Sequence, residues 1–114
     1  MSVKFAILGA GNMGRGHGLR LEAAGATIAA VCDRSAKARK EFLEEMAETD
    51  IREYENFDEM LEKEDFDGLF ICLPPFAQKD QLEKAAKRGK HIFIEKPIAL
   101  NTETGKRMVQ AARD

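Results

Sequence analysis

The 114-residue sequence contains no tryptophan, only three prolines and two cysteines, and no large excess of charge of either sign. Its formal net charge of −2 produces no strong electrostatic field, so we expect no nucleic-acid partner. No apolar run is long enough to span a membrane, and no basic segment followed by an apolar one precedes Val3. These absences predict a cytoplasmic protein that does not contact membranes. With 44% hydrophobic residues, the chain can form one globular domain over residues 1–114.

The two cysteines, Cys32 and Cys72, each end a predicted strand, and in the strand order given below those strands flank a third. Their separation is then two strand spacings, roughly 9–10 Å, whereas a disulfide needs Cα atoms within about 7 Å. No cluster of histidine or cysteine accompanies either thiol, so we expect no metal site. We interpret both cysteines as small, buried apolar residues.

Short apolar runs alternate with helical patterns along the chain. Strands are expected over residues 3–8, 27–32, 51–54, 68–73 and 91–94, and helices over 12–24, 36–48, a short segment after Asn56, 77–88 and 103–113. Ser35 and Asn56 are the candidate N-caps, and Gly25 and Gly89 stand where helices end. The inward stripe of the first helix is expected to be Met13, His17, Leu21 and Ala24. On that stripe, His17 is interpreted as a packing residue rather than a catalyst.

The first strand runs directly into a glycine-rich turn and then into a helix, in the sequence VKFAILGAGNMG. In that context, G-x-G-x-x-G is the dinucleotide-binding fingerprint. Gly9 allows a tight turn, Gly11 has no Cβ to block a pyrophosphate, and Gly14 lets the helix pack close to the strand. The free backbone N–H groups at the helix start, at Asn12 and Met13, then face the anion.

The alternation of strands and helices predicts an α/β protein with a doubly wound parallel sheet, the Rossmann fold, in the strand order 3-2-1-4-5. Ligands of such sheets bind at the carboxyl ends of the first and fourth strands, where the order reverses. A full dinucleotide fold has a sixth strand, and we expect this chain to lack it.

An acidic residue, Asp33, follows the second strand about twenty residues beyond the glycine turn, where an acid accepts hydrogen bonds from ribose hydroxyls. A carboxylate there repels a 2′-phosphate and favours NAD. NADP stays possible, because Arg34 could clamp that phosphate or stack on adenine. The alternatives are a structural turn with a solvated aspartate and a solvated cation at Arg34. Leu73 and Pro74, at the end of the fourth strand, are expected to line the same site.

The fifth strand ends in Glu95-Lys96-Pro97, beside the point where the strand order reverses. Lys96 could hydrogen-bond a substrate hydroxyl or the nicotinamide ribose, and desolvation would lower its pKa toward that of a useful base. A surface lysine before a turn proline explains the same residues equally well.

Together, the glycine turn, Asp33, the turn at Pro74 and GKHIFIEKP followed by IALNT resemble a known family. The chain is similar, from Val3 to Ala112, to the N-terminal NAD(P)-binding domain of the glucose–fructose oxidoreductase and inositol dehydrogenase family (Gfo/Idh/MocA). The resemblance implies hydride transfer between a nicotinamide cofactor and a sugar, cyclitol or related hydroxylated substrate. It implies that the glycine turn, Asp33 and Glu95-Lys96-Pro97 hold the cofactor and that Lys96 assists at the reacting carbon. In such proteins the bond that corresponds to Lys96–Pro97 is often cis.

The sequence departs from the family pattern in two respects. Gln78 stands four residues after Pro74, where the family usually has a histidine. The second α/β domain, which supplies the substrate pocket in the family, is not in the sequence, so we expect small-molecule substrate binding only if such a domain is supplied. An uncovered fifth strand would also favour a homodimer.

Two other functions compete with the oxidoreductase. One is a non-enzymatic nucleotide-binding sensor or partner subunit, whose catalytic half is another chain. The other is methyl transfer from S-adenosylmethionine on a Rossmann fold, which Glu95-Lys96-Pro97 disfavours because that reaction has no evident use for a lysine there.

Overall fold

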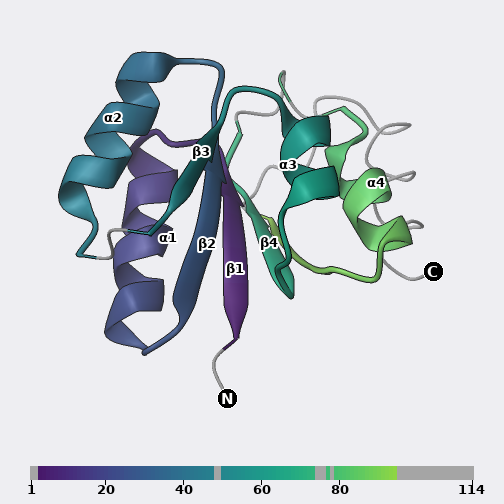
Figure 1. Cartoon of the computed structure of the whole chain (residues 1–114), viewed down its shortest axis with the longest axis horizontal. Helices are drawn as coiled ribbons and strands as arrows, with labels where there is room; N and C mark the ends of the chain where they lie inside the picture. The colour runs from purple at the N-terminus through teal and green to yellow at the C-terminus, as the bar shows by residue number, and fades with distance from the viewer. Residues whose placement is uncertain (1–2, 48–49, 74–76, 78, 95–114) are drawn as a thin grey trace.

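The sheet of the computed structural model has five parallel strands in the order β3-β2-β1-β4-β5 (Figure 1). The structure describes residues 3–47, 50–73, 77 and 79–94. Their elements are β1 (Lys4–Leu8), α1 (Asn12–Ala23), β2 (Thr27–Cys32), α2 (Ala36–Glu45), β3 (Arg52–Tyr54), α3 (Phe57–Lys63), β4 (Gly68–Ile71), α4 (Gln81–Lys87) and β5 (His91–Ile94). The predicted doubly wound sheet and its strand order 3-2-1-4-5 are therefore confirmed.

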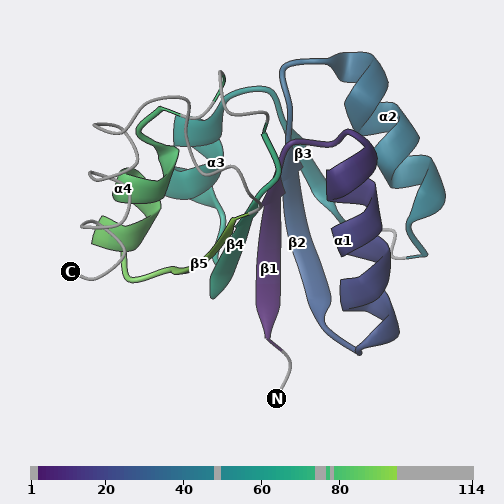
Figure 2. The ribbon, with the colours of Figure 1, turned by 180° about the vertical axis from the view of Figure 1, so that it is seen from behind.

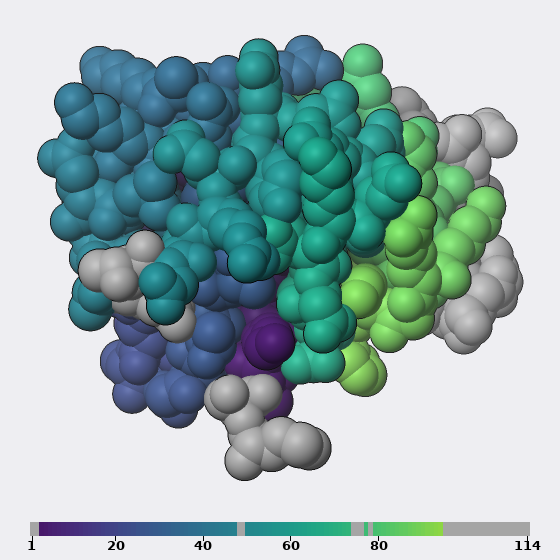
Figure 3. Space-filling model, viewed as in Figure 1, coloured from purple at the N-terminus to yellow at the C-terminus, as the bar shows by residue number. Residues whose placement is uncertain are grey.

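Among the described residues, α1 and α2 cover one face of this sheet and α3 and α4 cover the other, as the opposite views of Figures 1 and 2 show. Alternation along β1 divides its side chains between the two faces. Ile7 packs with Phe42 of α2 and with Met46, the residue after that helix, on one face, whereas Ala6 and Leu8 join the core beneath α3 and α4 on the other. In the space-filling view, blue and teal residues cover most of the purple β1, which reaches this surface only near its amino end (Figure 3). The strand that leads into the glycine turn is thus held rigidly from both sides.

The ends of several helices follow from single residues. The Ser35 hydroxyl accepts from the backbone N–H of Ala38 at 3.1 Å, so it caps α2 as predicted. Asn56 caps α3 in the same way, because its side-chain oxygen accepts from the backbone N–H of Glu59 at 3.0 Å. Gly25 and Gly89 follow α1 and α4 with φ of 84° and 76°, a left-handed conformation that glycine adopts readily.

The predicted inward stripe of α1 is wrong for Met13, whose exposed fraction is 45%, and for Ala24, which is also exposed. The buried residues of the helix are Gly14 and Gly18. A Cβ on Gly18 would lie 2.9 Å from Sδ of Met46 and 3.1 Å from the ring of Phe42, so the carboxyl end of α2 and the residue after it occupy the space that a larger residue of α1 would need. His17 packs its ring on Phe70, with centroids 4.9 Å apart, as the packing interpretation expected.

Several boundaries also differ from the expected ones. The helix expected over 77–88 begins at Gln81, after the N-cap residue Asp80, and α2 ends at Glu45 rather than at residue 48. The segment 51–54 contributes only Arg52–Tyr54 to the sheet, as the edge strand β3. The helix expected over 103–113 lies outside the described residues.

Candidate functional site

The glycine turn follows β1 directly and requires glycine at its first position. Gly9 has φ of 103°, and a Cβ there would lie 2.8 Å from the carbonyl oxygen of Cys72. Its backbone N–H donates to the carbonyl oxygen of Cys32 at 2.8 Å. The turn is therefore held against the carboxyl ends of the strands on both sides of β1.

The other two glycines of the motif have different surroundings. A Cβ on Gly14 would lie 1.9 Å from the carbonyl oxygen of Gly9, so only glycine lets α1 pack this close to the turn. A Cβ on Gly11 would meet nothing within 4 Å. Gly11 therefore borders open space. A side chain at this position would project into that space, which a bound anion could otherwise occupy.

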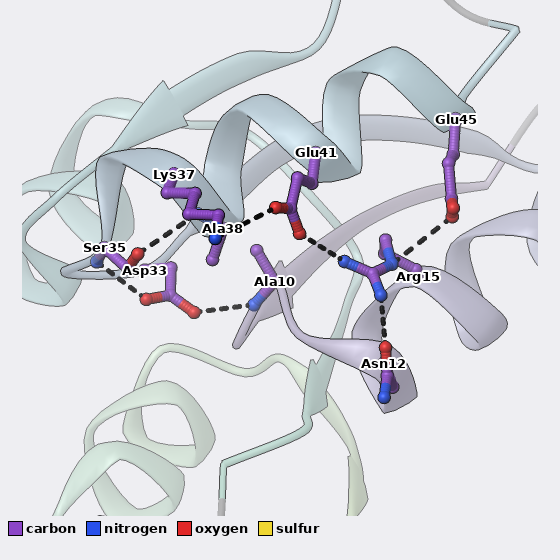
Figure 4. A network of polar contacts seen from close by, with 9 residues as sticks. All are labelled: Ala10, Asn12, Arg15, Asp33, Ser35, Lys37, Ala38, Glu41 and Glu45. Carbon is purple, nitrogen blue, oxygen red and sulfur yellow. Dashed lines mark hydrogen bonds and ion pairs between the residues drawn. The ribbon is translucent and has the colours of Figure 1, made fainter.

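The start of α1 directs its first backbone N–H groups toward that open space. Gly11 is its N-cap and provides no side-chain hydrogen bond, and the first turn carries no acidic residue. The first N–H groups of a helix have no intrahelical acceptors, so those at Asn12 and Met13 are suited to an anion. The Asn12 side chain is engaged elsewhere, because its oxygen accepts from the guanidinium of Arg15 (Figure 4).

Asp33 is bonded to the glycine turn through its carboxylate. Oδ2 accepts from the backbone N–H of Ala10 at 2.8 Å, and Oδ1 accepts from that of Ser35 at 2.8 Å (Figure 4). The register of the parallel strands causes this contact, since Leu8 of β1 lies level with Cys32 of β2. Each carboxylate oxygen has a further lone pair that can accept from a ribose hydroxyl.

A cavity of about 600 Å³ opens beside Asp33, within the size range of small-molecule sites. It lies at the carboxyl ends of β1, β2 and β4. Its lining includes three of the predicted cofactor residues, Asp33, Arg34 and Leu73. The rest of its lining consists of Leu8, Cys32, Glu55, Asn56, Phe57, Asp58, Ala77, Lys79, Asp80, Gln81 and Lys84. The predicted glycines are not among these described lining residues, so the cavity adjoins the glycine turn without including it.

Charges of both signs surround the cavity. Lys84 of α4 pairs with Asp58 of α3 at 2.8 Å and with Asp80, the N-cap residue of its own helix, at 3.3 Å. Its hydrogen bond to Asp58, followed by that to Asp80, raises the pKa of Lys84. Arg34 is exposed at the same cavity. Burial, followed by the negative charge of Asp33, raises the pKa of the Cys32 thiol to about 12, so this thiol is not a nucleophile at neutral pH.

The sequence did not point to two further contacts of this site. One is Ala10, whose backbone N–H donates to Asp33. The other is Arg39 of α2, which donates to the carbonyl oxygen of Asp33 and to Glu53. The available sequence signal for Arg39 was its position four residues after the N-cap Ser35. Residues four apart lie on the same side of a helix, so Arg39 faces the segment that precedes α2.

Several predicted site residues lie outside the described part of the chain. They are Pro74, Glu95, Lys96 and Pro97, together with Gln78. Over residues 3–47, 50–73, 77 and 79–94, no three histidine, cysteine or acidic side chains form a group that could hold a metal ion. Within the same ranges, no helix is both long and apolar enough to cross a membrane.

Comparison with known proteins identifies the class. The model of the Gfo/Idh/MocA family, an oxidoreductase family with an NAD-binding Rossmann fold, matches residues 3–114. The chain belongs to this family and is its NAD-binding Rossmann domain.

Individual relatives cover the chain almost completely. It is 33% identical over 115 residues to inositol 2-dehydrogenase of Rhizobium meliloti, an alignment with 100% of this chain and 34% of the relative. It is 32% identical to 2,7-anhydro-N-acetylneuraminate hydratase of Mediterraneibacter gnavus, covering 99% of this chain and 29% of the relative. The chain thus spans about a third of the length of these curated relatives.

A solved structure has the same arrangement. The WlbA dehydrogenase of Chromobacterium violaceum, in complex with NADH and UDP-GlcNAcA, superposes with a TM-score of 0.88 at 29% identity. The superposition covers 98% of this chain and 32% of that one. The fold inferred from the sequence is therefore that of a protein solved with a nicotinamide cofactor.

Proposed function

We propose that this chain binds the cofactor for an oxidoreductase that transfers hydride between NAD and a sugar, cyclitol or related hydroxylated substrate. The observation that carries the proposal is the contact of Asp33 with Ala10, which fixes an ionisable acid beside the glycine turn. The family supports the cofactor class, and the names of its members, an inositol dehydrogenase among them, support a polyhydroxylated substrate.

The residues present fit a dinucleotide. In our proposal, the open space over Gly11 takes the pyrophosphate, and the free N–H groups of Asn12 and Met13 donate to it. The carboxylate of Asp33 accepts from the adenosine ribose. Gly9 and Gly14 have no direct role in this, because they allow the turn and the helix to reach their positions.

The cavity beside Asp33 is the natural place for the adenine half of the cofactor. Leu73 and Leu8 supply apolar surface there, and Arg34 lies at the same cavity, where its guanidinium could stack on the base. We further propose that NAD is preferred, because an ionised Asp33 would face a 2′-phosphate at this position. NADP remains the alternative through Arg34.

The chemical step needs residues outside the described part of the chain. A bound nicotinamide supplies the hydride chemistry. We propose that Lys96, within Glu95-Lys96-Pro97, hydrogen-bonds the reacting hydroxyl and assists transfer of its proton, as the family resemblance implies. Pro74 is proposed to line the cofactor site beside Leu73. We propose that substrate selection depends on residues that correspond to the part of the relatives that this chain does not cover.

Titration with NADH, NADPH and S-adenosylmethionine by calorimetry tests the cofactor proposal. We expect binding of NADH, weaker binding of NADPH and no binding of S-adenosylmethionine. Binding of S-adenosylmethionine alone would contradict the oxidoreductase function.

A chimaera tests the chemistry. This chain would replace the corresponding domain of the Rhizobium meliloti inositol 2-dehydrogenase, and NADH formation from inositol would be followed at 340 nm. We expect activity, and a loss of roughly 10²-fold or more in the Lys96→Met chimaera, the range typical of a proton-transferring group. Full activity of the Lys96→Met chimaera would show that Lys96 takes no part in the chemical step.

We also propose a cytoplasmic location and a homodimer that forms at the β5 side of the sheet. Phe93 of β5 is 44% exposed and lies beside Phe5 and Phe70, with ring centroids 6.0 and 4.8 Å away. An exposed apolar strand at the end of the described sheet favours association. Light scattering of wild-type protein and the Phe93→Ser variant tests the dimer. A wild-type monomer at high micromolar concentration would contradict it.

A further inference from the structure

Arg39 of α2 reaches back across the start of its own helix. Its Nη1 donates to the carbonyl oxygen of Asp33 at 2.5 Å, and its Nε donates to Oε1 of Glu53 at 2.8 Å. The Arg39 side chain is only 14% exposed, whereas that of Glu53 is 50% exposed. The guanidinium therefore connects three segments: α2, the loop after β2, and the edge strand β3.

These bonds complete the fixation of Asp33. The backbone N–H of Asp33 donates to the carbonyl oxygen of Tyr54 at 3.0 Å, and its carbonyl accepts from Arg39. Its two carboxylate oxygens accept from Ala10 and Ser35. Among these partners, Arg39 alone acts through a side chain, so it is the partner that a substitution can remove without altering the main chain.

We infer that Arg39 is a positioning residue for cofactor recognition, acting through Asp33 without touching the dinucleotide. The inference rests on the proposed function. Arg39 is absent from the described residues that line the cavity, and its donors are directed at Asp33 and Glu53. It therefore differs from Arg34, which lies at the cavity itself.

The physical reason lies in the geometry of the loop. Without the guanidinium, the carbonyl of Asp33 loses its side-chain donor, and the peptide between Asp33 and Arg34 can rotate. Because the backbone N–H of Ser35 lies beyond that peptide and holds Oδ1, the rotation loosens the carboxylate and the acceptors that a ribose hydroxyl would meet. The result is weaker recognition of the dinucleotide that depends on this carboxylate, NADH, with a smaller effect on NADPH.

A double-mutant cycle separates this role from a general structural one. Affinity for NADH and NADPH would be measured by cofactor fluorescence for wild type, Arg39→Met, Asp33→Ala and the double variant. Lys40→Met is the matched control, since it removes the neighbouring exposed cation of the same helix. Circular dichroism verifies that each protein is folded.

We expect Arg39→Met to weaken NADH binding about five- to tenfold, a size typical of coupling between contacting residues. Lys40→Met should match wild type. In the Asp33→Ala background, Arg39→Met should cause no further loss. Wild-type affinity in a folded Arg39→Met protein, or additive losses in the double variant, would overturn the inference.

Arg39→Gln serves the same cycle if the methionine variant does not fold, because it removes the charged fork but keeps a polar side chain. The same coupling with Asp33→Ala is expected, and additivity would again overturn the inference. A wild-type protein that binds neither dinucleotide would instead contradict the proposed function. The two failures are therefore distinguishable.

Discussion

The backbone N–H of Ala10 donates to Oδ2 of Asp33 at 2.8 Å, which joins the glycine turn after β1 to the acid after β2. The two residues are 23 positions apart in the sequence. Their contact depends on the parallel register that places Leu8 beside Cys32. The acid expected to recognise the ribose thus also holds the glycine turn. A substitution of Asp33 therefore affects both ribose recognition and the support of the turn.

Replacing Asp33 should lower affinity for NAD more than for NADP. In Asp33→Ala, we expect at least about a tenfold loss of NAD affinity, because hydrogen bonds to a charged group contribute about 1.5–3 kcal/mol. Loss of the repelling carboxylate should leave NADP affinity nearly unchanged. Calorimetry with both cofactors measures this, and Asp65→Ala, which removes an exposed acid before β4, is the control. Equal losses for both cofactors would show that Asp33 does not select between them.

Substitutions of two glycines of the motif should affect stability and cofactor binding separately. Gly14→Ala places a Cβ 1.9 Å from the carbonyl oxygen of Gly9, and we expect it to lower the free energy of unfolding by about 2–3 kcal/mol. Gly11→Ala meets no atom within 4 Å, so it should fold normally but bind NADH weakly, because its methyl group projects into the open space. Urea unfolding and NADH titration measure the two effects. A stable Gly14→Ala protein, or a Gly11→Ala protein with wild-type affinity, would contradict this division.

The sheet order and the helix caps could be predicted because they depend on local patterns. Apolar runs that alternate with helices restrict the connections to right-handed crossovers. Ser35 and Asn56 cap their helices through backbone groups three residues away, which a short sequence window contains.

The inward face of α1 could not be predicted from the same patterns. Hydrophobicity favours Met13, but the helix approaches the glycine turn and α2 so closely that glycines occupy the contact. This closeness is set by residues distant in sequence, such as Met46. The bonds of Arg39 could not be predicted either. Glu53 belongs to a separate element, β3, and Asp33 accepts through its main-chain carbonyl, which a sequence pattern does not reveal.

Both cysteines should resist alkylation in the folded protein. Cys32 and Cys72 are buried, with exposed fractions of 2% and 7%. The pKa of Cys32 is raised to about 12, chiefly by burial, so almost no thiolate is present at pH 8. Mass spectrometry after iodoacetamide treatment should detect little labelling of Cys32 in buffer and labelling of both thiols in guanidinium chloride. Rapid labelling of Cys32 in the folded protein would contradict its burial.

The single tyrosine, Tyr54, should ionise only at very high pH. Its hydroxyl donates to Glu64, whose side chain is 2% exposed and also accepts from Arg52 at 3.0 Å. This hydrogen bond, followed by burial, raises the pKa of Tyr54 from 10.0 to about 12. Because the folded-state pKa lies above the unfolded value, the contact stabilises the fold below pH 10, and this contribution is lost as the pH rises toward 12.

Absorbance at 295 nm measures this ionisation without interference, since the chain has one tyrosine and no tryptophan. We expect a midpoint near 12 for the wild type. In Glu64→Gln the midpoint should be lower, because a neutral amide oxygen accepts more weakly and does not repel the phenolate. Arg52→Met, which removes the cation from the same cluster, should not lower the midpoint, since a positive charge nearby favours ionisation. A wild-type midpoint at 10, or no change in Glu64→Gln, would show that Glu64 does not hold the Tyr54 proton.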